Sequence, residues 1–153
     1  MAVDADLTRK NILIIYHSQG GVMEKMAQRF AAGARREEAA RIVFRKAAEA
    51  SIDDLLCCDA IAIGSPEYFG TMAGMIKDFF DRTYLIARDR TIGLPYALFV
   101  CAGNDGRGAI TQIERLAIGY KWRKVLAYER IVGEPTEYGF AQKMRLIFSS
   151  FLL

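Results

Sequence analysis

Residues 59–83 of this 153-residue chain read DAIAIGSPEYFGTMAGMIKDFFDRT. The apolar run at residues 59–64 is typical of a strand buried on both faces of a parallel sheet. Glycine, proline and aromatic residues then predict a loop over residues 65–71, in which Pro66 breaks the strand. Apolar residues at helical spacing follow, so we expect a helix over residues 72–88.

The same order of strand, loop and helix recurs on both sides of this stretch. The predicted strands are 11–16, 41–46, 59–64, 96–101 and 125–132, and the predicted helices are 22–36, 52–57 with Ser51 as N-cap, 72–88, 108–120 and 140–153. Five alternations predict an α/β fold with a parallel sheet covered by helices on both faces. Ligands of such sheets bind beyond the carboxyl ends of the strands, so the loops after the first, third and fourth strands are the candidate site.

The length predicts one domain over residues 1–153, with residues 1–9 as a disordered N-terminal extension. An acidic N-terminus without an apolar stretch, and no apolar run near the roughly 20 residues of a membrane span, predict a soluble cytoplasmic protein with no membrane partner.

Three cysteines and one histidine, without zinc-site spacing, predict free thiols and no metal. The net charge is +3, and basic residues form two small groups, the first made of Arg35, Arg36, Arg41, Arg45 and Lys46 and the second of Lys121, Arg123 and Lys124. We interpret both groups as solvated surface, so no nucleic-acid partner is expected. Trp122, within the second group, is interpreted as a partner surface or as a ring with an exposed edge.

The first candidate loop, HSQGGVM at residues 17–23, joins a buried strand to a helix N-terminus. Exposed backbone N–H groups and the positive end of the helix suit a phosphate there. The loop has no lysine or arginine, which excludes a nucleoside-triphosphate P-loop. A dinucleotide Rossmann site is disfavoured because GxGxxG is missing and Arg45 and Lys46 end the second strand. The phosphate-binding candidates are Ser18, Gln19, Gly20, Gly21, Val22 and Met23.

The second candidate loop places Tyr68 and Phe69 at the ligand end of the third strand, where a flat ring could stack on them. Gly70 would let the backbone approach such a ring closely. Both aromatic residues could instead fold back into the core.

The motif GSPxYFGxMAGxxKxFxDRT at residues 64–83 resembles the segment after the third strand of FMN-binding flavodoxin-like proteins. It is especially similar to the NAD(P)H-dependent FMN or quinone reductase group. The first loop also resembles theirs as Y-x-S-x-x-G, at Tyr16, Ser18 and Gly21. The resemblance spans essentially the whole chain and implies a flavodoxin-like three-layer sandwich, with a five-stranded parallel sheet of order 2-1-3-4-5 and helices on both faces.

In that family the first loop holds the FMN phosphate and the second contacts the isoalloxazine ring. The resemblance thus assigns the ring to Pro66, Glu67, Tyr68, Phe69 and Gly70. The third loop covers the other side of the flavin, with Ala102, Gly103, Asn104, Gly106 and Arg107 as contacts. The first loop has fewer hydroxyls than those of flavodoxins, so we expect FMN to be loosely bound.

Two residues are candidates for a catalytic role. His17 could donate a proton, and Arg107 could favour the anionic reduced flavin by its charge. A backbone or solvent contact of His17 and a solvent-facing Arg107 are the alternatives.

The function predicted from these features is that of an FMN-binding oxidoreductase, which uses NAD(P)H to reduce a quinone or another small-molecule acceptor. The alternatives are a one-electron flavodoxin-type carrier, which the +3 charge disfavours, and a flavodoxin-fold binding protein without tight flavin. A receiver domain is excluded because the first and third strands end without aspartate. Apolar residues off the main face of the predicted helix 140–153 suggest a homodimer.

Overall fold

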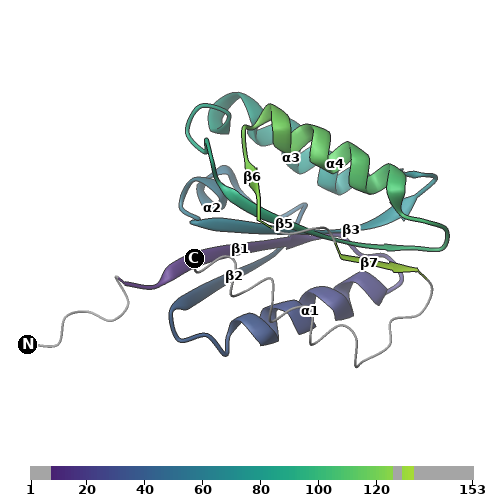
Figure 1. Cartoon of the computed structure of the whole chain (residues 1–153), viewed down its shortest axis with the longest axis horizontal. Helices are drawn as coiled ribbons and strands as arrows, with labels where there is room; N and C mark the ends of the chain where they lie inside the picture. The colour runs from purple at the N-terminus through teal and green to yellow at the C-terminus, as the bar shows by residue number, and fades with distance from the viewer. Residues whose placement is uncertain (1–7, 126–128, 133–153) are drawn as a thin grey trace, which may run out of the picture.

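A parallel β-sheet with helices on both faces forms the centre of the computed structural model, which describes residues 8–125 and 129–132 (Figure 1). The elements, in chain order, are β1 (Lys10–Tyr16), α1 (Val22–Ala34), β2 (Ala40–Lys46), α2 (Ile52–Leu56), β3 (Ala60–Tyr68), β4 (Thr71–Met72), α3 (Gly74–Ala87), β5 (Pro95–Ala102), α4 (Arg107–Gly119), β6 (Arg123–Lys124) and β7 (Glu129–Val132). The predicted helix 140–153 and most of the predicted extension 1–9 lie outside the described residues.

The strand order is β2-β1-β3-β5-β6, and every neighbouring pair along this path is parallel. This confirms the predicted order 2-1-3-4-5 and the flavodoxin-like class. The predicted number of five strands was wrong, because the sheet has seven. The chain after β3 folds back as the antiparallel strand β4, and the last predicted strand is replaced by two pieces, β6 and β7, which pair with successive parts of β5.

Alternate residues of β1 face opposite layers, as the period of a strand requires. Ile12 and Ile14 pack in the same cluster as the buried face of α1. Leu13 and Ile15 pack in the other cluster, with residues of α2, α3 and α4. Figure 1 shows the same arrangement, with α1 on one side of the sheet and α2, α3 and α4 on the other. The continuous apolar run of β1 is therefore explained by burial on both faces.

Pro66 does not break the strand, because β3 continues through it to Tyr68. The pairing of β1 with β3 ends at Gly64, so no β1 residue is paired opposite Pro66. Pro66 pairs only with Cys101 of β5 in the register of the sheet. A proline is tolerated where one side of a strand has become an edge.

Trp122 is buried, so neither predicted placement of its ring at the surface was correct. Its Nε1–H donates to Thr91 Oγ1 at 2.8 Å, and its ring lies 4.6 Å from that of Tyr120. The sequence pattern missed this because the basic neighbours Lys121 and Arg123 are exposed while Trp122 alone turns inward.

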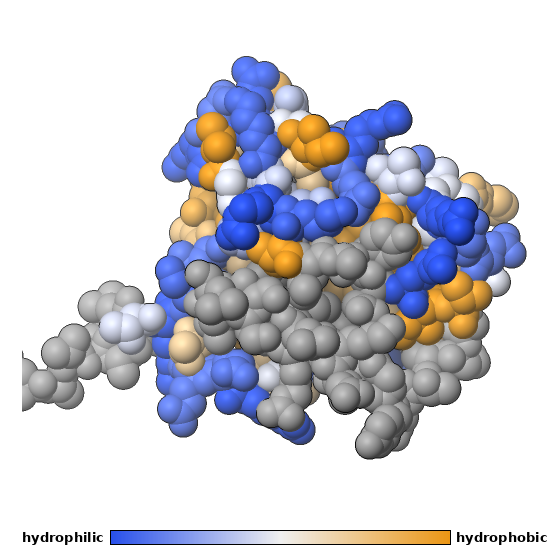
Figure 2. Space-filling model, viewed as in Figure 1, coloured by the Kyte–Doolittle hydropathy of each residue, from blue (hydrophilic) through white to orange (hydrophobic). Residues whose placement is uncertain are grey.

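The described surface over α3 and α4 is largely hydrophilic and is interrupted by separate apolar patches (Figure 2). Leu85, Ile92 and Ile118 are among the exposed large apolar side chains. No helix within residues 8–125 or 129–132 is long and apolar enough to cross a membrane.

Candidate functional site

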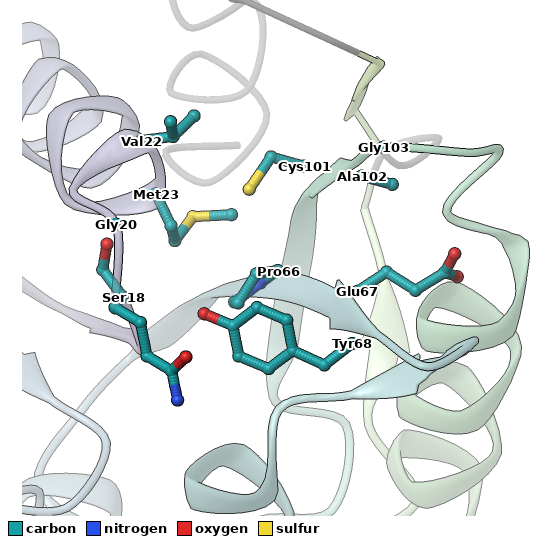
Figure 3. A pocket seen from close by; sticks show the side chains of 11 residues that line it. Ser18, Gly20, Val22, Met23, Pro66, Glu67, Tyr68, Cys101, Ala102 and Gly103 are labelled. Atoms are coloured by element: carbon teal, nitrogen blue, oxygen red, sulfur yellow. The ribbon is translucent and has the colours of Figure 1, made fainter.

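A cavity of about 270 Å³ opens at the carboxyl ends of β1, β3 and β5. All three candidate loops contribute to it (Figure 3). Its lining residues are Ser18, Gln19, Gly20, Val22, Met23, Pro66, Glu67, Tyr68, Cys101, Ala102 and Gly103. Parallel strands bring these loops together because their carboxyl ends meet at one edge of the sheet.

The first loop leaves the N-terminus of α1 open toward the cavity. Gly21 is the N-cap residue and has φ 91°, a left-handed conformation that a side chain would strain. Its N–H donates to Ser18 Oγ at 3.1 Å, which fixes the loop. Among the described side chains none is found to accept from the N–H groups of the following first turn, and Val22 and Met23 line the cavity. These N–H groups are therefore available to an anion.

Glu24 is the acidic residue of the first turn of α1, and its carboxylate is engaged elsewhere. Its Oε1 accepts from the hydroxyl of the buried Tyr16 at 3.1 Å. Burial, together with the bond to Glu24, raises the pKa of Tyr16 to about 12. The hydroxyl therefore stays protonated at neutral pH and remains a donor to Glu24.

The second loop is a tight hairpin between β3 and β4. Glu67 pairs with Met72 and Tyr68 with Thr71, which leaves Phe69 and Gly70 as the two turn residues. Both have positive φ, 53° and 73° respectively, as a two-residue hairpin turn of type I′ requires. Glycine adopts this conformation freely, whereas Phe69 is strained by it and its side chain is fully exposed.

Tyr68 supplies the aromatic wall of the cavity, whereas Phe69 lies outside it. The ring of Tyr68 contacts His17 edge to face, with 6.2 Å between ring centroids. Burial raises the pKa of Tyr68, and a hydrogen bond with the backbone of Gln19 partly offsets this rise. The same bond links the second loop to the first. A flat ligand ring could stack on this half-buried phenol.

His17 lies beside the cavity and does not line it. Its backbone N–H donates to the carbonyl of Gly64 at 3.2 Å. Partial burial lowers the pKa of its imidazole, so the neutral form dominates at neutral pH. A neutral imidazole is a poor proton donor, which weakens the case for His17 as an acid.

The third loop contributes Ala102 and Gly103 to the cavity, whereas Arg107 is not among the lining residues. The guanidinium Nε lies 3.9 Å from Asp105 Oδ2, and the Arg107 side chain is 76% exposed. The backbone N–H of Arg107 donates to Asp105 Oδ1 at 3.0 Å, so Asp105 contacts both the backbone and the side chain of Arg107. Gly106 is the N-cap of α4, with φ 70°.

The cavity thus unites ten of the sixteen predicted cofactor contacts and leaves six outside. Those within are Ser18, Gln19, Gly20, Val22, Met23, Pro66, Glu67, Tyr68, Ala102 and Gly103, of which Glu67 lines the wall but turns its carboxylate toward α4. Those outside are Gly21, Phe69, Gly70, Asn104, Gly106 and Arg107.

Cys101 and Gln112 are the two residues near the site that the sequence pattern did not assign to it. Cys101 lines the cavity from the end of β5, and burial raises the pKa of its thiol. Its position at a strand end was the available signal. Gln112 Oε1 accepts from the N–H of Met72 at 3.0 Å, across 40 residues of sequence, and no local signal announces such a contact.

The donor set of the cavity consists of backbone N–H groups, a hydroxyl, an amide and apolar walls. No group of three His, Cys, Asp or Glu side chains that could hold a metal ion is found in the described part of the chain. Neutral donors at a helix N-terminus suit a phosphate monoester, and the walls formed by Met23, Pro66 and Tyr68 suit a flat ring. The arrangement fits a ligand with both parts.

Comparisons with known proteins agree with this geometry. The model of the family described as NADPH-dependent FMN reductase matches residues 31–132. A protein of Paracoccus denitrificans (strain Pd 1222) named NAD(P)H dehydrogenase (quinone) is 31% identical over 157 residues, covering 89% of this chain and 72% of the relative. A protein of Geobacter sulfurreducens with the same name is also 31% identical, over 161 residues, covering 89% of this chain and 76% of the relative.

Among solved structures, a flavodoxin from the domain Archaea superimposes with a TM-score of 0.81 at 21% identity, covering 93% of this chain and 96% of that one. At this identity the likeness shows the fold alone.

Proposed function

Because this chain belongs to the family of NADPH-dependent FMN reductases, we propose that it binds FMN in the cavity and uses NAD(P)H to reduce a quinone or another small acceptor. The observation that carries the proposal is the cavity itself, which joins an open helix N-terminus to an apolar slot with an aromatic wall. The relatives named NAD(P)H dehydrogenase (quinone) support the choice of acceptor class.

The phosphate would be held by the first loop and the first turn of α1. The N–H groups that follow Gly21 face the cavity, and the hydroxyl of Ser18 and the amide of Gln19 stand beside them. Hydrogen bonds to a charged phosphate are stronger than those to neutral groups, which suits a loop without lysine or arginine. The positive end of the helix adds to this attraction.

The ring would lie between the second and third loops. Tyr68 and Pro66 form one wall, and Cys101 and Ala102 lie on the neighbouring strand β5. Bound FMN supplies the redox chemistry, which is electron transfer from NAD(P)H to the acceptor. The protein residues orient the ring, keep water from its apolar side and leave its outer side open to both reactants.

The proposal is tested in two steps with the purified protein. Excess FMN is added, free flavin is removed, and the visible spectrum of the retained protein is recorded. Two flavin bands are expected, and the loaded protein should oxidise NADH or NADPH when a water-soluble benzoquinone is present. Retained flavin without NAD(P)H oxidation would favour a one-electron carrier, and no retained flavin would overturn the proposal.

A further inference from the structure

Glu67 lines the cavity but directs its carboxylate away from it. Figure 3 shows its side chain extending from β3 on the far side from Pro66, toward α4. Its Oε2 accepts from the backbone N–H of Ala109 at 3.1 Å. Ala109 is the third residue of α4, so its N–H is one of those that have no partner within the helix. A carboxylate at this position also interacts favourably with the positive end of the helix.

Two further contacts join the same hairpin to α4. The side chain of Gln112 accepts from the N–H of Met72, one turn further along α4. Gly108 lies directly against Gly70, since a Cβ placed on Gly108 would be 1.7 Å from the carbonyl oxygen of Gly70. The hairpin is thus fixed to α4 at three points, and Glu67 supplies the charged one.

This attachment links two walls of the cavity. Pro66, Glu67 and Tyr68 belong to the strand that enters the hairpin, and Gly103 belongs to the loop that leads into α4. If the hairpin moved relative to α4, the space between these walls would change. A ligand would then have to order both walls when it binds, and this cost would weaken its affinity.

We propose that Glu67 is a positioning residue, whose carboxylate accepts the Ala109 N–H and so holds the second and third loops at the separation that the flavin ring needs. The proposal rests on the proposed function only in naming flavin as the ligand. It differs from a direct role of Glu67 at the ring, because the carboxylate acts through α4.

The test compares four proteins: the wild type, Glu67→Ala, Glu67→Gln and Glu114→Ala. Glutamine keeps an oxygen that can accept from Ala109. Glu114→Ala is the matched control, because it also removes a carboxylate from α4, one that pairs with Lys124 of β6. Amide hydrogen exchange of Ala109 is measured by NMR without flavin, and the Kd for FMN is measured by quenching of flavin fluorescence.

For Glu67→Ala we expect Ala109 to exchange about tenfold faster and the FMN Kd to rise about tenfold, as the loss of one hydrogen bond to a charged group predicts. Glu67→Gln should stay within about threefold of wild type in both measurements, and Glu114→Ala should match wild type.

Unchanged Ala109 exchange in Glu67→Ala would overturn the proposal. If the FMN Kd rose equally in both Glu67 variants while Ala109 exchange stayed at the wild-type rate, Glu67 would contact the flavin directly and the positioning role would be wrong. If the wild type bound no FMN, the proposed function would fail, and Ala109 exchange alone would decide whether Glu67 holds the hairpin.

Discussion

The N-termini of α1 and α4 lie at the same edge of the sheet and have similar backbone conformations. They differ in whether the N–H groups of the first helical turn donate to side-chain carboxylates. Both helices have 13 residues and follow a left-handed glycine N-cap, Gly21 or Gly106. At α4, carboxylates of Asp105 and Glu67 accept from first-turn N–H groups. At α1, no carboxylate of a described residue is found to accept from a first-turn N–H, and that of Glu24 accepts from the Tyr16 hydroxyl instead.

This difference explains where an anion can bind. A helix N-terminus attracts phosphate only while its N–H groups are free, and a carboxylate already in place both uses the donors and repels a second anion. We therefore propose the α1 end as the phosphate site. The first-turn N–H groups of Arg107 and Ala109 in α4 already donate to carboxylates, and in our proposal this end holds the hairpin. The sequence predicted the phosphate at the α1 end from the loop 17–23. The acidic residues of the first turns alone would have favoured the other helix, because α1 has Glu24 there and α4 has none.

We expect the largest effect when a carboxylate is placed at the open N-terminus of α1. Ser18→Asp places a carboxylate where Ser18 Oγ now accepts from Gly21, next to the expected phosphate. Two like charges about 4 Å apart in a partly buried site repel by about 4 kcal/mol, so the FMN Kd should rise at least about 100-fold. Ser18→Asn is the neutral control and should retain most of the affinity. Equal losses in the two variants would show that shape and not charge governs this loop.

At the N-terminus of α4, Gly108→Ala should detach the hairpin from the helix. The new Cβ would overlap the carbonyl oxygen of Gly70, so backbone must move, and we expect a loss of about 1–3 kcal/mol in the free energy of unfolding. Gly119→Ala on the same helix is the control. Its Cβ would meet Tyr84 Cε2 at 3.9 Å, an ordinary contact, and the gain in helix propensity should leave stability equal or slightly higher. Urea unfolding of both variants measures the difference.

A smaller effect is expected from the N-cap of α1. Gly21→Ala has open space around its Cβ, so its cost is the strain of φ +91°, about 1–2 kcal/mol of stability. Gly20→Ala also has open space, and its φ lies outside the left-handed range, so it should be nearly neutral. If thermal unfolding gave the same midpoint for both variants, the left-handed N-cap would not be a requirement of this loop.

The smallest effect concerns His17, the titratable residue that begins the first loop. Burial lowers its pKa below the ordinary 6.5, so the unfolded state binds more protons between the two values. The contribution of His17 to stability is therefore present above about pH 6.5 and lost as the pH falls through the folded-state pKa. The flavin-free wild type should lose slightly more stability than His17→Gln between about pH 7.5 and 5 in urea titrations. The difference is small because solvent screens this ring. The same pH slope in both proteins would contradict the shift.

The sequence predicted those features that depend on local patterns. The N-cap of α2 is one, because Ser51 Oγ accepts from the N–H of Asp54 as predicted for an N-cap; the structure adds that Asp54 Oδ2 accepts from the N–H of Ser51. The apolar runs of β1 and β3 predicted buried parallel strands, and the parallel arrangement then placed the three loops together.

Features that depend on contacts across the fold could not be predicted. Glu67 and Ala109 are 42 residues apart, and the bond between them exists only because β5 brings α4 beside the hairpin. The two residues of β4 carry no strand pattern of their own and become a strand by pairing with Glu67 and Tyr68. Arg107 was expected at the flavin for its charge, and only the structure shows Asp105 beside it.

The measurement that tests the open end of α1 most directly is the ratio of the Kd values of the wild-type protein for riboflavin and for FMN. The two ligands share the ring and differ in the phosphate, so the ratio reports the contribution of the phosphate site. Charge-assisted bonds from the first turn of α1 predict that FMN binds at least about 100-fold more tightly. Kd values within about threefold of each other would contradict the assignment of the phosphate to this helix end.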